Sequence, residues 1–207
     1  MKFTKLKQAT VALMTVGMLT ACGSNTEKIV ETITTQVQAD EAAVTQLQET
    51  MAKQATFMDS FDDLLKDAAK KYEKVEDVLE QLKTETGSLK SAFETAQTTL
   101  ALSEADETKL ENLLAKSEKE ENYEAVNGLV SAYQAYKTDL ETLSADNVTL
   151  MAKYESFLNE ISADMPFQDL ENLIGELNQS LEKVQTSYEA YTNSATEFQT
   201  VLMSQQN

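Results

Sequence analysis

The fold is decided by residues 30–82, which read VETITTQVQADEAAVTQLQETMAKQATFMDSFDDLLKDAAKKYEKVEDVLEQL. Apolar side chains recur there at alternating steps of three and four, without a glycine or proline. The two resulting seams carry Val30, Val37, Val44, Met51, Met58, Leu65, Tyr72 and Leu79, and Ile33, Asp40, Leu47, Gln54, Phe61, Ala68, Val75 and Leu82. A heptad pattern kept up over roughly 80 Å of helix predicts long partner helices.

The composition is typical of continuous helix and of an acidic surface. The 207 residues include one proline, five glycines, no histidine and no tryptophan, and all 17 basic residues are lysines. The formal net charge is −18, and without the first 21 residues 14 lysines face 35 acids, a charge of −21. Such a surface repels phosphate backbones, so nucleic acid is excluded as a partner.

Three chain reversals are expected. The first is placed at residues 84–88, where Gly87 is a helix stop and Ser88 an N-cap. The alternative is a continuous helix through Gly87, because Leu82, Leu89, Phe93, Ala96 and Leu100 keep one heptad phase. The second reversal lies between Lys116 and Gly128, and the third at residues 162–166, around Pro166.

Between these reversals the pattern predicts further helical features. A capping box at residues 103–106 precedes an apolar run. Clean seams follow at Leu129, Tyr133, Tyr136, Leu140, Leu143, Asn147, Leu150, Tyr154, Phe157 and Ile161, and at Phe167, Leu170, Ile174, Leu177, Leu181, Val184, Tyr188, Tyr191, Ala195, Phe198 and Leu202. Gly175 is interpreted as a close packing point rather than a hinge, and the polar seam residues Gln54 and Asn147 as register-fixing.

The expected fold is therefore all-α: an elongated antiparallel up-and-down bundle of four long helices with coiled-coil-like packing, or three if Gly87 lies inside a helix. Residues 30–205 form its single domain, and residues 30–44 are expected to project from it as a stalk, since they are rich in threonine and interrupted by Asp40.

Residues 1–21 have the features of an export signal. A lysine-rich start precedes an apolar run that is too short to span a bilayer. The run ends in Leu19, Thr20, Ala21 and Cys22, which resembles the lipobox of bacterial lipoproteins. That resemblance implies cleavage before Cys22 and diacylation of its thiol, with residues 22–29 as a lipidated tether. Cys22 is the only cysteine and so has no intramolecular disulfide partner.

The residue types argue against an enzyme. Histidine is absent, the glycines never cluster into a phosphate loop, and no calcium-loop spacing occurs, so we expect no catalytic residue, cofactor or metal site. The carboxylate pairs Asp62/Asp63 and Glu104/Asp106 are interpreted as solvated helix faces rather than glycosidase acids. Weak cation binding around residues 118–121 remains an alternative.

The tyrosines on the seams have two interpretations. They could form an aromatic platform for glycan rings, or bury their rings in the core with the hydroxyls at its edge. Seam positions favour core packing. The set comprises Tyr72, Tyr133, Tyr136, Tyr154, Tyr188 and Tyr191.

A lipobox followed by the segments SAYQAY (131–136), YESFL (154–158), LENLI (170–174) and YEAYT (188–192) resembles the YkyA-type cell-wall-binding lipoproteins of Gram-positive bacteria. The resemblance covers most of the chain after Cys22. It implies a helical-bundle lipoprotein on the outer face of the cytoplasmic membrane, with a non-enzymatic role in binding peptidoglycan or wall polymer. The alternative is a scaffold that presents a coiled-coil face to an envelope protein or self-associates; the oligomeric state stays open.

Overall fold

The computed structural model describes residues 24–68, 76–162 and 165–204, and every regular element among them is an α-helix. The five helices are α1 (Asn25–Ala68), α2 (Glu76–Leu100), α3 (Glu104–Ser117), α4 (Tyr123–Glu160) and α5 (Phe167–Ser204). The helices pack against one another as an all-α bundle, as the sequence predicted. Three of them, α1, α4 and α5, are long, with 44, 38 and 38 residues.

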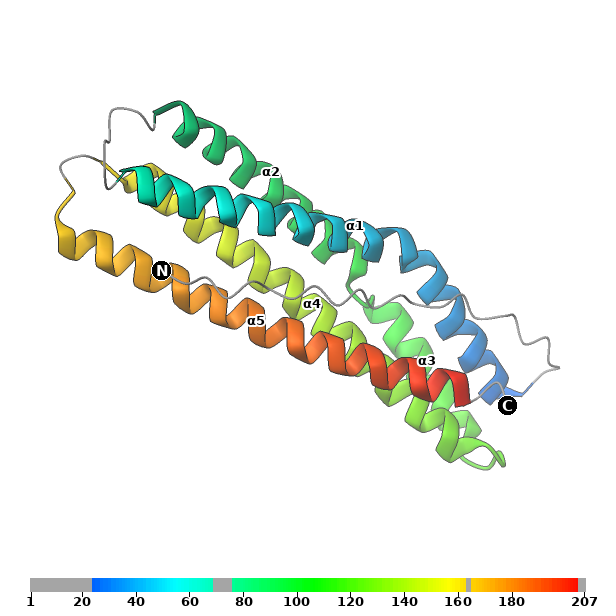
Figure 1. Cartoon of the computed structure of the whole chain (residues 1–207). Coiled ribbons are helices and arrows are strands. Elements are labelled where there is room, and N and C mark those ends of the chain that lie inside the picture. The colour runs from blue at the N-terminus through cyan, green and yellow to red at the C-terminus, as the bar shows by residue number, and fades with distance from the viewer. Residues whose placement is uncertain (1–23, 69–75, 163–164, 205–207) are drawn as a thin grey trace.

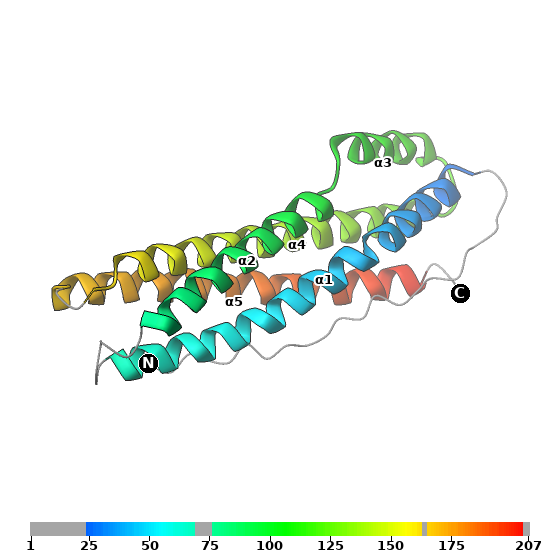
Figure 2. The same ribbon diagram turned by 90° about the horizontal axis from the view of Figure 1, so that it is seen from above.

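The helices form an elongated up-and-down arrangement (Figure 1). α1 and α4 run in one direction, and α2, α3 and α5 run in the other. The second leg of the bundle is thus divided between α2 and α3, and Figure 2 shows α3 set to one side of the long axis. α4 is central, because it packs against each of the other four helices.

The core follows the predicted seams closely. On α4 every predicted position from Leu129 to Phe157 is buried, and on α2 the positions from Leu82 to Leu100 are buried along one face. α5 departs from the pattern at its start, because Phe167 is 72% exposed and Leu170 and Ile174 are only partly buried. The seam residues Tyr72 and Val75 lie outside the described residues.

The predicted reversal at residues 84–88 is wrong. α2 continues through Gly87, and the chain reverses direction between Ala68 and Glu76 instead. A glycine inside a helix costs only about 1 kcal/mol relative to alanine. The burial of Leu82, Leu89 and Phe93 on the same face outweighs that cost.

The start of the domain also differs from the expectation. α1 begins at Asn25, so residues 25–29 are helical and Ile29 is fully buried, which shortens the predicted tether. The predicted stalk at residues 30–44 does not project, since α3 and α4 pack against α1. The threonines of this stretch, whose low helix propensity suggested an unstable helix, lie within α1, and Thr32 and Thr34 are buried.

The remaining connections lie where the sequence predicted them, but some residues near them have a different role from the predicted one. Ser103 caps α3 by accepting a hydrogen bond from the Asp106 amide, as the capping box predicted. The second reversal falls between α3 and α4, but residues 127–128 lie inside α4. Pro166 precedes α5, and its carbonyl accepts from the first-turn amides. Gly175 is not a close packing point, because a β-carbon there would meet no atom within 4 Å.

Candidate functional site

The predicted lipid attachment site lies two residues before Ser24, the first described residue. Cys22 and the lipobox residues Leu19, Thr20 and Ala21 fall outside the described part of the chain. Immediately after them, Ser24 and Glu27 form a reciprocal capping box. The Ser24 amide donates to the Glu27 carboxylate at 3.0 Å, and the Glu27 amide donates to the Ser24 hydroxyl at 3.2 Å. Only two residues therefore separate Cys22 from the start of α1 at Asn25.

The first turn of α1 is also bound from outside by the connection between α3 and α4. Glu120 accepts hydrogen bonds from the Asn25 amide at 3.0 Å, the Asn25 side-chain amide at 3.0 Å and the Thr26 amide at 3.1 Å. The Asn25 side chain also donates to the Lys116 carbonyl. We call this set of contacts the N-terminal clamp. It satisfies amides that a helix N-terminus leaves unpaired, and a carboxylate is favoured at that end of the helix dipole.

The N-terminal clamp changes the pKa of Glu120. Hydrogen bonds from the Thr26 and Asn25 backbone amides lower the pKa of the Glu120 carboxyl below its usual value. The weak cation site considered for residues 118–121 therefore includes a carboxylate whose two oxygens already accept hydrogen bonds from α1.

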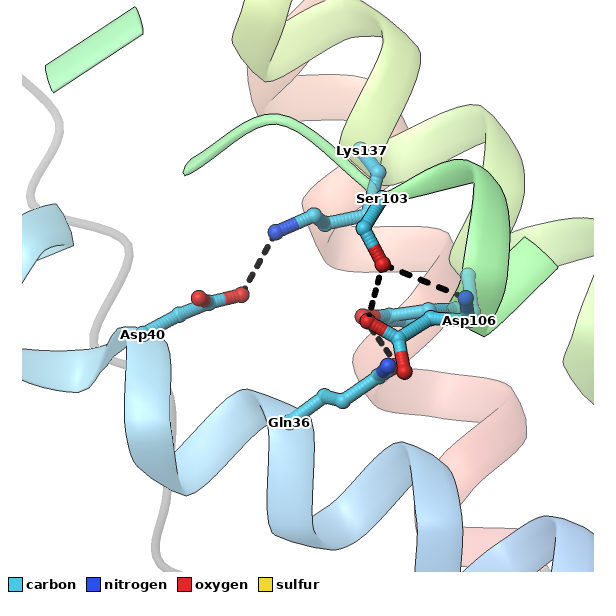
Figure 3. Close-up of polar contacts among 6 residues, drawn as sticks. Gln36, Asp40, Ser103, Asp106 and Lys137 are labelled. Atoms are coloured by element: carbon cyan, nitrogen blue, oxygen red, sulfur yellow. Dashed lines mark hydrogen bonds and ion pairs between the residues drawn. The ribbon is translucent and has the colours of Figure 1, made fainter. Parts of the chain in front are cut away.

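A second polar site lies farther along α1, where it meets α4. The Lys137 ammonium donates to the Asp40 carboxylate at 2.6 Å, and the two side chains are only 4% and 15% exposed. Figure 3 shows the two residues facing each other from different helices. Burial raises the pKa of the Asp40 carboxyl, and the hydrogen bond and charge of Lys137 oppose that rise. The resulting ion pair is largely removed from solvent.

Four further polar residues lie near this ion pair: Gln36 on α1, Tyr133 on α4, and Ser103 and Asp106 at the start of α3. Figure 3 labels Gln36, Ser103 and Asp106. The Tyr133 hydroxyl donates to the Gln36 carbonyl oxygen at 2.9 Å, one helical turn before the ion pair on both helices. The Ser103 hydroxyl donates to Asp106 at 2.5 Å, and the charge of Asp106 contributes to the raised pKa of Asp40. We call Gln36, Asp40, Ser103, Asp106, Tyr133 and Lys137 the α1–α4 polar cluster.

The polar cluster is suited to fixing helix positions. Its ammonium is paired with a carboxylate and buried, and its tyrosine donates to an amide, so neither presents a reactive atom to solvent. Sequence reasoning identified Asp40 only as an interruption of the seam and missed Lys137. The sequence contains a signal for this pair, because Asp40 is the one acid on its seam and Lys137 directly follows the seam residue Tyr136. The two opposite charges could have been expected to pair.

The rings of four seam tyrosines pack in the core, as their positions indicated, and Tyr188 is partly buried. The hydroxyls of Tyr136 and Tyr154 do not reach the edge of the core as expected, because they are buried as well. Tyr133, Tyr136 and Tyr154 are at most 1% exposed, and Tyr191 is 3% exposed. The rings of Tyr133, Tyr136 and Tyr154 contact Phe57, Phe61 and Phe198 with centroid separations of 4.7–5.5 Å. The ring of Tyr191 lies 6.0 Å from that of Tyr136. Burial raises the pKa of each of these hydroxyls. These four rings therefore cannot serve as a surface platform for glycans, and Tyr72 lies outside the described residues.

The carboxylate pairs considered from the sequence do not flank a cleft. Asp63 is 74% exposed and pairs with Lys66, and Asp106 belongs to the capping of α3. Among the described residues, no cluster of three or more acids, histidines or cysteines is arranged to bind a metal ion. An open depression of about 730 Å³ follows α1, and most of its lining residues, from Gln38 to Lys53, are polar and exposed.

None of the helices in the described ranges is long and apolar enough to cross a membrane. Comparisons of the chain with protein-family models, curated protein sequences and solved structures gave no match.

Proposed function

We propose that the chain is an extracytoplasmic lipoprotein, anchored through lipid on Cys22 to the outer face of the cytoplasmic membrane, with a non-enzymatic binding or scaffolding role at the cell envelope. One observation carries the proposal. Only Gly23 and Ser24 separate Cys22 from α1, and the first turn of α1 is bound to the α3–α4 connection by the N-terminal clamp. Lipid on Cys22 would thus attach a structured end of the bundle directly at the bilayer, and two acyl chains suffice for stable attachment.

The far end of the anchored bundle would lie well away from the membrane. α1 and α4 both start at the end near Cys22, and α4 with its 38 residues extends about 57 Å from it. The opposite end carries the α4–α5 junction, where Phe167 is 72% exposed and is followed by the partly buried Leu170 and Ile174. We propose that this far end contacts the ligand, for which peptidoglycan or wall polymer is the first candidate because of the family resemblance.

Co-sedimentation with isolated cell-wall sacculi tests wall binding. The protein would begin at Gly23, which retains all five helices, and sacculi would be used with and without teichoic polymers. Retention that survives a calcium chelator supports wall recognition. Retention lost with the chelator indicates that cations bridge the acidic body, of formal charge −21 after residue 21, to wall anions. Absence of retention contradicts wall binding.

A matched pair of variants locates the contact. Phe167→Ser removes the exposed apolar side chain at the far end, and Met203→Ser does so at the anchored end, where Met203 is 51% exposed. The proposal predicts loss of retention for Phe167→Ser and unchanged retention for Met203→Ser. Equal effects of both changes would contradict binding through the far end.

The second candidate is a scaffold for an envelope protein. Its specific support is the same exposed Phe167, since phenylalanine is among the residues enriched at protein–protein interfaces. A stalk at residues 30–44 that projects from the bundle would offer a surface for self-association, but Gln36 and Asp40 of that stretch bind Tyr133 and Lys137 of α4. Cross-linking in intact membranes would identify a protein partner if sacculi do not retain the protein, and light scattering would give the oligomeric state.

A further inference from the structure

α3 is the least buried helix of the bundle. Of its 14 residues only Leu110 and Ser117 are buried, and Leu113 and Leu114 are partly buried. It is separated from α2 by residues 101–103 and from α4 by residues 118–122. A segment with few buried apolar contacts and a break at each end needs less free energy to open than the long helices do.

Both ends of α3 contact α1, and the contacts define how the two helices lie. At its start, Ser103 and Asp106 lie beside Asp40 (Figure 3). At its end, the Lys116 carbonyl and the Glu120 carboxylate bind Asn25, and Glu120 also binds Thr26. α3 therefore runs antiparallel along residues 25–40 of α1. Its length of about 21 Å equals the length of helix between Thr26 and Asp40.

This stretch of α1 depends on α3 for its burial and for its capping. Ile29 and Ile33 are fully buried although they lie at the very start of the helix, where α1 packs against α3 and α4. The same stretch is rich in threonine, which has low helix propensity. Its two first amides donate to Glu120, which belongs to the connection that follows α3. Separation of α3 would remove its share of the cover, together with the cap from Glu120.

We infer that α3 and residues 25–40 of α1 form one cooperative unit that opens before the rest of the bundle, and that the Glu120 carboxylate controls this opening. The inference does not require lipid on Cys22. If the chain is anchored as proposed, the unit is the part of the body next to the bilayer, and opening exposes Ile29, Ile33 and Leu110 there.

Hydrogen–deuterium exchange at neutral pH tests this inference with protein that begins at Gly23. Amides of α3 and of residues 25–40 should exchange with a common opening free energy, faster than the α4 core from Leu140 to Tyr154. Glu120→Ala should accelerate exchange in both segments by on the order of tenfold, because charge-assisted hydrogen bonds to the first turn of α1 are lost. Glu120→Gln retains one acceptor and should have an intermediate effect.

Glu121→Ala is the matched control, since the neighbouring Glu121 is exposed and should leave exchange unchanged. The inference is overturned if Glu120→Ala affects only the Asn25 and Thr26 amides, or if α3 and residues 25–40 open with different free energies. Equal acceleration throughout α4 and α5, or loss of the whole fold, would also contradict it, because the proposed unit is local.

Discussion

The Nζ atom of Lys137 lies 2.6 Å from Oδ2 of Asp40, and the same 97-residue offset joins Tyr133 to Gln36 one turn earlier. It also relates Tyr154 to Phe57, whose rings meet edge to face at 5.0 Å. The parallel helices α1 and α4 thus keep one register along their contact. A slip by one heptad would break both polar pairs together and leave a buried lysine without its carboxylate.

Breaking this buried ion pair should lower the free energy of unfolding. Asp40→Asn should destabilise the protein by about 3 kcal/mol, because Lys137 stays buried beside a neutral partner. Replacing both residues, as Asp40→Leu with Lys137→Met, should restore most of the lost stability. Urea unfolding followed by circular dichroism gives both free energies.

The pair between Lys153 and Glu176 provides the control. Its 2.7 Å separation is nearly the same, but the side chains are 42% and 53% exposed. Lys153→Met should therefore cost less than about 1 kcal/mol. Similar costs for Asp40→Asn and Lys153→Met would show that burial does not make the Asp40 pair special.

Removal of the hydroxyl should change the stability of the protein differently at two buried tyrosines, Tyr133 and Tyr154. The Tyr133 hydroxyl donates to Gln36, so Tyr133→Phe should cost about 1 kcal/mol. The Tyr154 hydroxyl is buried without a hydrogen-bond partner among the described residues, so Tyr154→Phe should be neutral or slightly stabilising. Chemical denaturation of the two variants in parallel gives the comparison, and a larger cost at Tyr154 would contradict this assignment of partners.

Gly87→Ala tests the continuous helix α2. A β-carbon at Gly87 would meet no atom within 4 Å, and alanine has the higher helix propensity. The change should stabilise the protein by about 0.5–1 kcal/mol. A turn at Gly87 with a left-handed backbone would instead make the same change destabilising, so the sign of the shift in Tm separates the two structures.

The N-terminal clamp should give stability a defined pH dependence. The pKa of Glu120 is lowered in the folded protein, so its contribution is fully present above the unfolded pKa, near 4.5, and is lost as pH falls through the lower folded value. The difference in Tm between the wild type and Glu120→Gln should therefore be constant from pH 6 to 7 and shrink below about pH 4.5. A difference that grows on acidification would contradict the clamp.

Regular burial was predictable from the sequence. The seams of α4 and the second half of α5 follow a strict step of three and four, and each of these positions from Leu129 to Phe157 and from Val184 to Leu202 is at least partly buried. The capping box at Ser103 was readable for the same reason, because its contacts are local in sequence.

Contacts between distant residues were not predictable in this way. The interaction of Glu120 with Asn25 spans 95 residues and that of Lys137 with Asp40 spans 97. The charges of Asp40 and Lys137 are visible in the sequence, but no local pattern says that these two residues meet. The misplaced first reversal has the same origin. Gly87 is a local stop signal, but burial against the neighbouring helices α1 and α4 decides that α2 continues through it.

Membrane fractionation of cells that express the full chain tests lipid attachment at Cys22. We expect the wild type to sediment with membranes, and its N-terminal peptide, beginning at Cys22, to carry the mass of two acyl chains on the thioether. Cys22→Ser should release the protein from the membrane without changing its helical content. An unprocessed or unlipidated Cys22, or membrane association that survives Cys22→Ser, would contradict the account.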